Sequence, residues 1–118
     1  MSNIRELDAA RITDAVEALC IEANTTLPKD VKAALDAAEA AEPWPLAKQT
    51  LGLLQQNLCV AAQKELPICQ DTGMACVFVE LGQDVHIHGD LTDAVNEGVR
   101  RGYEKAYLRK SITADPLQ

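Results

Sequence analysis

The sequence has few aromatic residues, which make up 3% of its 118 positions. It has no apolar run near the roughly 20 residues that a membrane-spanning helix needs, and its N-terminus lacks a basic-then-apolar leader pattern. It also lacks an excess of basic side chains, because 18 acidic residues against 11 basic ones give a net charge of −7. Binding to phosphate groups needs clustered Lys and Arg. These absences argue against nucleic acid and membranes as partners, and we expect a soluble cytoplasmic protein.

The four cysteines lack the C-x-x-C spacing of a zinc ribbon or a thioredoxin-like site. In a reducing compartment they are expected to be metal-binding, catalytic or buried rather than joined in disulfides. Cys20 lies at the end of the first predicted helix, Cys59 on the apolar side of the third, and Cys76 within an apolar run, so all three are predicted to be core residues. The fourth, Cys69, lies in a polar loop.

Apolar residues at helical spacing predict three helices in the first half of the chain, over residues 4–23, from Thr26 to residue 41, and over residues 46–64. Thr26 is predicted to cap the second helix, with Pro28 in its first turn. Pro43 and Pro45 separate the second helix from the third. Gly52 in the third helix predicts a close approach by another helix.

The second half of the chain predicts a β-hairpin followed by a helix. An apolar run over residues 74–81 indicates a buried strand, Gly82 and Gln83 a tight turn, and residues 84–88 an alternating second strand. A final helix over residues 91–110 follows, capped by Asp90 or Thr92, with an apolar stripe of Val95, Val99, Tyr103 and Tyr107. The predicted class is α+β, divided into helices over 1–66, a cysteine loop and hairpin over 67–89, and the helix over 91–110.

The loop between the third helix and the apolar run carries the densest group of reactive side chains. Residues 67–73 read Pro-Ile-Cys-Gln-Asp-Thr-Gly, and side chains on such a loop are free to do chemistry. Cys69 is a candidate metal ligand or nucleophile, or a small residue that packs at the corner. Asp71 is a candidate general acid or base, or the first residue of an Asx turn. Gln70 could bind a substrate oxygen or face water.

Two further groups allow both a functional and an ordinary interpretation. His86 and His88 share one face of a predicted strand, as a His-x-His metal pair would, but the sequence shows no third ligand nearby. The polar face of a half-exposed hairpin explains them equally. Arg109 lies at the end of the predicted last helix, where it could bind a carboxylate in bidentate fashion or compensate the helix dipole.

Two blocks of sequence resemble a known family. Residues 66–73, Leu-Pro-Ile-Cys-Gln-Asp-Thr-Gly, and residues 96–112 with their Tyr-Leu-Arg-Lys-Ser-Ile ending are similar to the α-type region of the iron–sulfur (class I) fumarate hydratases and tartrate dehydratases. The resemblance extends from about residue 46 to 117 and more weakly toward the N-terminus. It identifies the chain as the N-terminal part of that region.

The resemblance implies a set of roles for residues of this chain. Cys69 is one of three cysteine ligands of a [4Fe–4S] cluster, and the other two lie in segments that this chain does not contain. Gln70, Asp71 and Arg109 contact a small dicarboxylate, malate or fumarate, with Asp71 a candidate for proton transfer. The remainder of the α-type region and a β-type subunit or domain are expected partners, assembled as a homo-oligomer, and the chain alone is expected to be inactive. Two alternatives stay open, a tartrate dehydratase α subunit and a non-catalytic interaction domain.

Overall fold

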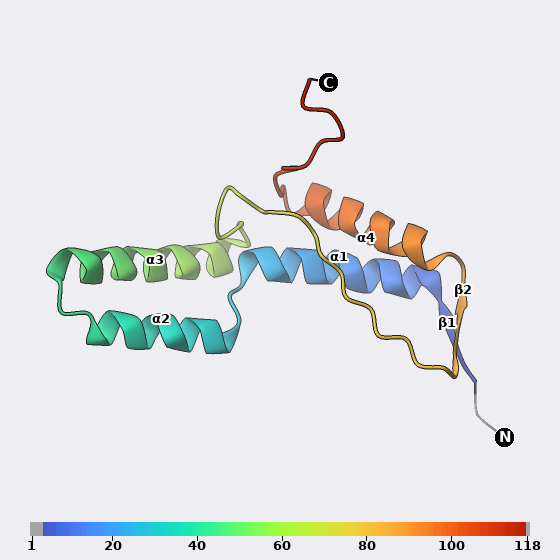
Figure 1. Cartoon of the computed structure of the whole chain (residues 1–118), viewed down its shortest axis with the longest axis horizontal. Helices are drawn as coiled ribbons and strands as arrows, with labels where there is room; N and C mark the ends of the chain where they lie inside the picture. Colours follow the sequence, from blue (N-terminus) through green and yellow to red (C-terminus); the bar gives the residue numbers. More distant parts are fainter. Residues whose placement is uncertain (1–3, 118) are drawn as a thin grey trace. The chain divides into compact units, whose positions relative to one another are not determined.

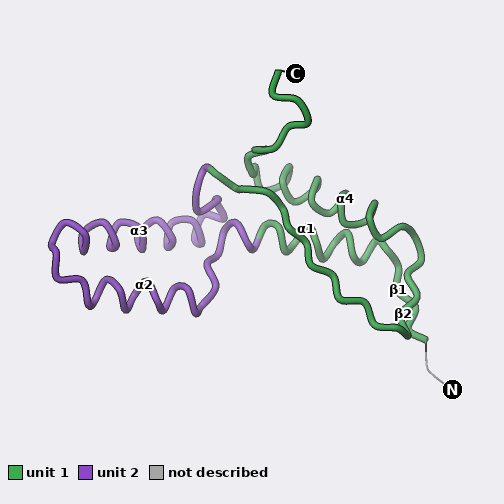
Figure 2. Tube along the Cα trace, in the orientation of Figure 1, with its two compact units in different colours: residues 1–21, 71–118 green, residues 22–70 purple. Residues whose placement is uncertain are grey.

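The computed structural model describes residues 4–117, which form two compact units. Of the described residues, one unit comprises 4–21 together with 71–117, and the other comprises 22–70 (Figure 2). The elements follow the order β1 (Arg5–Asp8), α1 (Ala9–Thr25), α2 (Lys29–Ala41), α3 (Pro45–Lys64), β2 (Val85–His88) and α4 (Leu91–Lys105) (Figure 1). The predicted α+β class is confirmed.

The first unit contains a sheet of two parallel strands, α1 as far as residue 21, and α4. Strand β1 pairs with β2 in the register Arg5–Val85 to Asp8–His88. Leu7 lies opposite Ile87, and these two partly buried side chains alternate with exposed neighbours on both strands. The core of the unit consists of Val16, Cys20, Tyr103 and Leu108.

Two glycines allow α4 to pack tightly against α1. A Cβ atom at Gly98 would lie 2.7 Å from both the Thr13 carbonyl oxygen and the Val16 Cβ. A Cβ at Gly102 would lie 2.8 Å from the Cys20 Cβ. Real Cβ atoms do not approach other atoms this closely, so the contact requires glycine at both positions.

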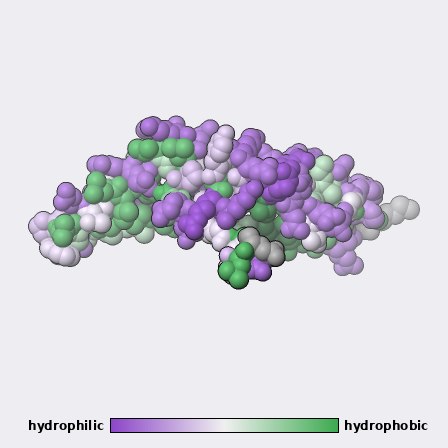
Figure 3. Space-filling view, turned by 90° about the horizontal axis from the view of Figure 1, so that it is seen from above, coloured by the Kyte–Doolittle hydropathy of each residue, from purple (hydrophilic) through white to green (hydrophobic). Residues whose placement is uncertain are grey.

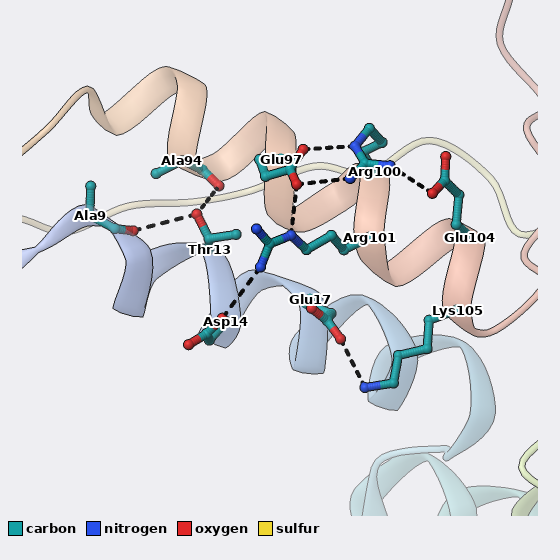
Figure 4. A network of polar contacts seen from close by, with 10 residues as sticks. All are labelled: Ala9, Thr13, Asp14, Glu17, Ala94, Glu97, Arg100, Arg101, Glu104 and Lys105. Carbon is teal, nitrogen blue, oxygen red and sulfur yellow. Dashed lines mark hydrogen bonds and ion pairs between the residues drawn. The ribbon is translucent and has the colours of Figure 1, made fainter.

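Polar contacts line the same interface (Figure 4). The buried Thr13 hydroxyl donates a 3.0 Å hydrogen bond to the Ala94 carbonyl oxygen. Farther along, Lys105 forms an ion pair with Glu17 at 3.0 Å. At its start, α4 is capped by Asp90, whose Oδ1 accepts a 2.8 Å bond from the Asp93 amide. Of the two predicted caps, Asp90 is therefore the one the structure contains.

The second unit is a helical hairpin in which α2 packs on α3. Gln55 connects the two helices, because its amide donates to Glu39 Oε2 at 3.1 Å and its carbonyl oxygen accepts from Lys32 at 3.1 Å. The predicted close approach at Gly52 is real but involves a side chain, since a Cβ there would lie 3.1 Å from Glu39 Oε1. The third helix begins and ends within one residue of its predicted bounds.

The predicted hairpin is wrong. The turn at Gly82 does form, with the Val85 amide donating to the Gly82 carbonyl oxygen at 3.2 Å, but β2 pairs with β1 instead of with residues 74–81. Those residues form no regular strand. Alternation identifies a strand without identifying its partner. Segment 5–8 does not stand out as a strand, because its one apolar residue, Leu7, also fits the helical spacing predicted over residues 4–23.

Three helix boundaries also differ from prediction. The first helix begins at Ala9 rather than residue 4, since Asp8 Oδ1 accepts the Ala10 amide at 2.8 Å and so caps it. Pro28, not Thr26, occupies the N-cap position of α2, and it has no capping side chain. Helix α4 ends at Lys105 rather than residue 110, because Tyr107 adopts a left-handed φ of 54°. The side chain of Tyr107 is consequently exposed instead of part of the stripe.

Many large apolar side chains remain on the surface (Figure 3). The segment 74–81 is the densest case, with Phe78 96% exposed and Val79 54% exposed. Cys76 within it is also exposed, as is Cys59 on α3, so the predicted burial of both thiols is wrong. Cys20 is buried as predicted, and burial raises the pKa of its thiol. Within the described residues, no helix is long and apolar enough to cross a membrane.

Candidate functional site

The cysteine loop begins at the C-terminal end of α3, where the chain turns sharply. Glu65 takes a left-handed φ of 51°, and the Leu66 amide donates back to the Ala61 carbonyl oxygen at 3.0 Å. Both features are typical of helix C-terminal caps. Pro67 then directs the chain away from the helix axis.

Two asparagines hold the backbone immediately before the cysteine. The Ile68 amide donates to the Asn24 carbonyl oxygen at 2.8 Å, and the Asn57 side-chain amide donates to the Ile68 carbonyl oxygen at 2.8 Å. Both polar groups of the Ile68 backbone are therefore satisfied within the second unit. Sequence reasoning did not single out Asn57, although an amide on a largely apolar helix close to the loop is a usable signal.

Cys69 and Gln70 end the second unit. Both side chains are exposed, and the Cys69 thiol donates to Gln70 Oε1 at 3.4 Å. An exposed thiol on a fixed backbone is accessible to a metal, and the adjacent amide is accessible to a ligand oxygen. Gln70 and Asp71 are consecutive residues that belong to different units.

Asp71 and Gly73 form an Asx turn, the structural role that the sequence allows for Asp71 as an alternative to a catalytic one. Asp71 Oδ1 accepts the Gly73 amide at 3.0 Å, and Gly73 has a φ of 64°, which favours glycine. The turn uses one oxygen of an exposed carboxylate. Asp71 Oδ2 is left for other partners, so the turn and a role in proton transfer are compatible.

Thr72 joins this turn to the chain that follows α4. Its hydroxyl donates a 2.7 Å hydrogen bond to the Arg109 carbonyl oxygen, and its own carbonyl oxygen accepts the Tyr103 hydroxyl at 3.2 Å. Burial raises the pKa of Tyr103, so its hydroxyl remains a donor at neutral pH. These bonds bring Arg109 beside Asp71–Gly73 across a wide sequence separation, with the guanidinium itself exposed.

A cleft of about 470 Å³ opens beside the same turn. Its walls come from the turn, from α4 and from the chain after it: Gly73, Met74, Ala75, Asn96, Val99, Arg100, Tyr103, Lys110, Ser111 and Ile112. Asp71 and Arg109 are not among the lining residues. Arg100 is already bound by Glu97 at 2.7 Å and Glu104 at 2.6 Å, so its charge is largely compensated.

The comparisons with known proteins agree with this motif. The family model of fumarate hydratase (Fumerase) matches residues 13–118. The chain is 34% identical over 104 residues to a provisionally named L(+)-tartrate dehydratase subunit alpha of Methanocaldococcus jannaschii, covering 86% of this chain and 36% of that protein. It is 28% identical over 99 residues to the L(+)-tartrate dehydratase subunit alpha of Escherichia coli K12, covering 84% of this chain and 33% of that protein.

A further relative is fumarate hydratase 2 of Leishmania major, which is 38% identical over 61 residues, 52% of this chain and 11% of that protein. The chain belongs to the fumarate hydratase (Fumerase) family, a family of hydro-lyases. The resemblance inferred from the two sequence blocks is thereby confirmed. The chain spans about a third of the length of the tartrate dehydratase α subunits that it matches.

Proposed function

We propose that this chain is the N-terminal part of the α-type region of an iron–sulfur hydro-lyase that reversibly hydrates fumarate to malate. Family membership supports the reaction class. The observation that carries the assignment is the 2.7 Å bond from Thr72 to the Arg109 carbonyl oxygen, because it joins the two sequence blocks of the motif. The bond supports the proposal because it holds the backbone of Arg109, which would bind a carboxylate, to the turn that contains Asp71, which would transfer a proton.

The residues present fit a cluster that takes one ligand from this chain. Cys69 offers an exposed thiol on a backbone fixed by two hydrogen bonds at Ile68. Among residues 4–117, no group of three potential ligand side chains gathers around Cys69. The remaining cysteine ligands would come from sequence beyond this chain, so the chain alone would be inactive. When bound, a [4Fe–4S] cluster with one open iron supplies a Lewis acid.

The side chains of the motif would have different roles, with two of them binding the substrate and one transferring a proton. Arg109 would bind one carboxylate in bidentate fashion, and the Gln70 amide would hydrogen-bond an oxygen of the same substrate. In dehydration Asp71 would donate a proton to the oxygen that leaves as water, and in hydration it would accept a proton from the incoming water, with Oδ1 held by the Gly73 amide. Removal of the carbon-bound proton needs a second base, which we assign to the β-type region.

The partners of the chain would be the rest of the α-type region and a β-type subunit or domain, assembled as a homo-oligomer. The exposed apolar segment 74–81 supports this, since Phe78 and its neighbours form the kind of surface that another element covers. The cytoplasm would be the compartment of the assembled enzyme.

A second candidate is the α subunit of an L(+)-tartrate dehydratase. The relatives from Methanocaldococcus jannaschii and Escherichia coli K12, which match 86% and 84% of this chain, carry that name. Tartrate differs from malate by one additional hydroxyl group, so the same Arg109 and Asp71 could serve both substrates.

The test is anaerobic iron–sulfur reconstitution of this chain and of a version extended by its natural downstream sequence and β-type partner. Bound iron, sulfide and visible absorbance are measured, followed by turnover of malate, fumarate and L-tartrate. We expect a cluster and activity only in the extended protein, both lost on Cys69→Ser and retained on Cys59→Ser. Preference for tartrate over malate would select the second candidate. Absence of cluster and activity in the extended protein would favour a non-catalytic interaction domain.

A further inference from the structure

Two histidines and a glutamate meet on the exposed face of the two-stranded sheet. Glu6 of β1 lies opposite His86 of β2 in the parallel register, and His88 follows two residues later on the same face. One ligand atom from each of the three residues lies within 4.8 Å of the other two. The His86 and His88 rings have centroids 4.9 Å apart, and His88 Nε2 contacts Glu6 Oε2. The sequence shows the histidine pair but not its third member, because the pairing of β1 with β2 does not follow from the sequence pattern.

We propose that Glu6, His86 and His88 form a binding site for a divalent transition metal, with Zn²⁺ the preferred ion. Two imidazoles and one carboxylate are a donor set that zinc uses in sites with an open coordination position. The side chains of Glu6 and His88 are each 58% exposed, which leaves room for water to complete the coordination. The site uses none of the residues of the cysteine motif.

The metal would connect segments that are far apart in sequence. Strands β1 and β2 have four residues each and form a sheet of two strands. Such small sheets are marginally stable without further support. An ion bound by both strands would hold the start of α1 and the start of α4 together, since each helix directly follows one of these strands. The site therefore has a structural consequence that is measurable without any enzymatic assay.

The experiment is a zinc titration of the 118-residue chain carrying Cys59→Ser, Cys69→Ser and Cys76→Ser, which removes the exposed competing thiols. Calorimetry gives the stoichiometry and Kd, and NMR follows the two imidazoles, the only histidines in the sequence. We expect one Zn²⁺ per chain, shifts of both imidazoles, and a higher melting temperature with zinc. His86→Ala, His88→Ala and Glu6→Gln should each weaken binding by roughly tenfold or more, the size of effect seen when a metal site loses a supporting group.

Asp8→Asn is the matched control. Asp8 lies on the same strand and face as Glu6, opposite His88, and the asparagine keeps an oxygen to cap α1. This variant should bind zinc with an unchanged Kd. The Glu6→Gln variant keeps the size of the side chain, and far-UV circular dichroism checks that it is folded. Zinc binding that is no tighter than in the double variant His86→Ala/His88→Ala, or that Asp8→Asn weakens as much as Glu6→Gln, would overturn the proposal.

Discussion

The Thr72 hydroxyl donates a 2.7 Å hydrogen bond to the backbone carbonyl oxygen of Arg109. The bond joins the turn of Asp71 and Gly73 to the chain after α4, so the two blocks of the family motif are held as one structure. Because the acceptor is backbone, the arginine side chain stays available for a ligand.

Loss of this bond should therefore affect substrate binding more than folding. In the extended, reconstituted protein we expect Thr72→Val to raise KM with little change in kcat, whereas Thr72→Ser, which keeps the hydroxyl, should restore most of the binding. The free energy of unfolding should fall by about 1 kcal/mol, the net value of a typical hydrogen bond. Steady-state kinetics and urea denaturation measure the two effects.

Thr113→Val is the control for that experiment. The Thr113 hydroxyl also donates to a backbone carbonyl oxygen, at 2.7 Å, but the acceptor is the nearby Asp115. An equal rise in KM for both variants would show that the link between Thr72 and Arg109 has no special part in binding.

Alanine at Gly98 should destabilise the first unit. The added Cβ would meet the Thr13 carbonyl oxygen and the Val16 Cβ at 2.7 Å, and neither can move without shifting backbone. Overpacking costs about 1–3 kcal/mol, against a gain of about 1 kcal/mol in helix propensity. We expect a net loss of stability in a thermal melt. Gly82→Ala is the control, since its nearest neighbour is Val85 at 3.7 Å and its φ is not positive, and it should melt like the parent chain.

Glu97 should make the stability of the chain depend on pH in the acidic range. Hydrogen bonds from Arg100 and then Arg101 lower the pKa of its carboxyl from 4.5 to about 2. A lowered pKa means that the contribution is complete above pH 4.5 and is lost as the pH falls toward 2. The melting temperatures of the parent chain and Glu97→Gln should differ at pH 6 and converge near pH 2.

Glu80→Gln is the control for the acid experiment, because it removes the same charge at a residue that lies outside α4 and takes no part in the ion pairs of Glu97. At pH 6 its melting temperature should lie closer to that of the parent chain than the melting temperature of Glu97→Gln does. A gap for Glu97→Gln that stays constant between pH 6 and pH 2 would contradict the assignment.

Replacing Phe78 should make the isolated chain more soluble. This side chain is 96% exposed within an apolar run, and such surfaces promote self-association. We expect Phe78→Ser to raise the concentration at which light scattering first detects association. Leu117→Ser is a matched control, because Leu117 is 93% exposed but lies outside the run. An equal gain in solubility from both variants would argue against a role for the segment.

The sequence predicted the features that depend on local chemistry. The bounds of α3, the Asp90 cap and the Asx turn at Asp71 all follow from residue types within a few positions of one another. It could not predict the pairing of β1 with β2, because strand partners are chosen by contacts between distant segments. The predicted burial of Cys76 is wrong for a related reason. An apolar run shows that a segment favours burial, but it does not show which other part of the protein would pack against it.

The two glycines of α4 also set the distance along the chain from the contact with α1 to Arg109. Gly98 and Gly102 fit against α1 so closely that α4 cannot slide along it without a collision, which fixes the position of α4 along α1. Each residue of an α-helix advances the chain by about 1.5 Å and turns it by about a quarter of a circle. An insertion between Gly102 and Arg109 would therefore move the arginine away from Thr72 while both helices remained intact. The number of residues between Gly102 and Arg109 is therefore as much a part of the motif as the identities of its residues.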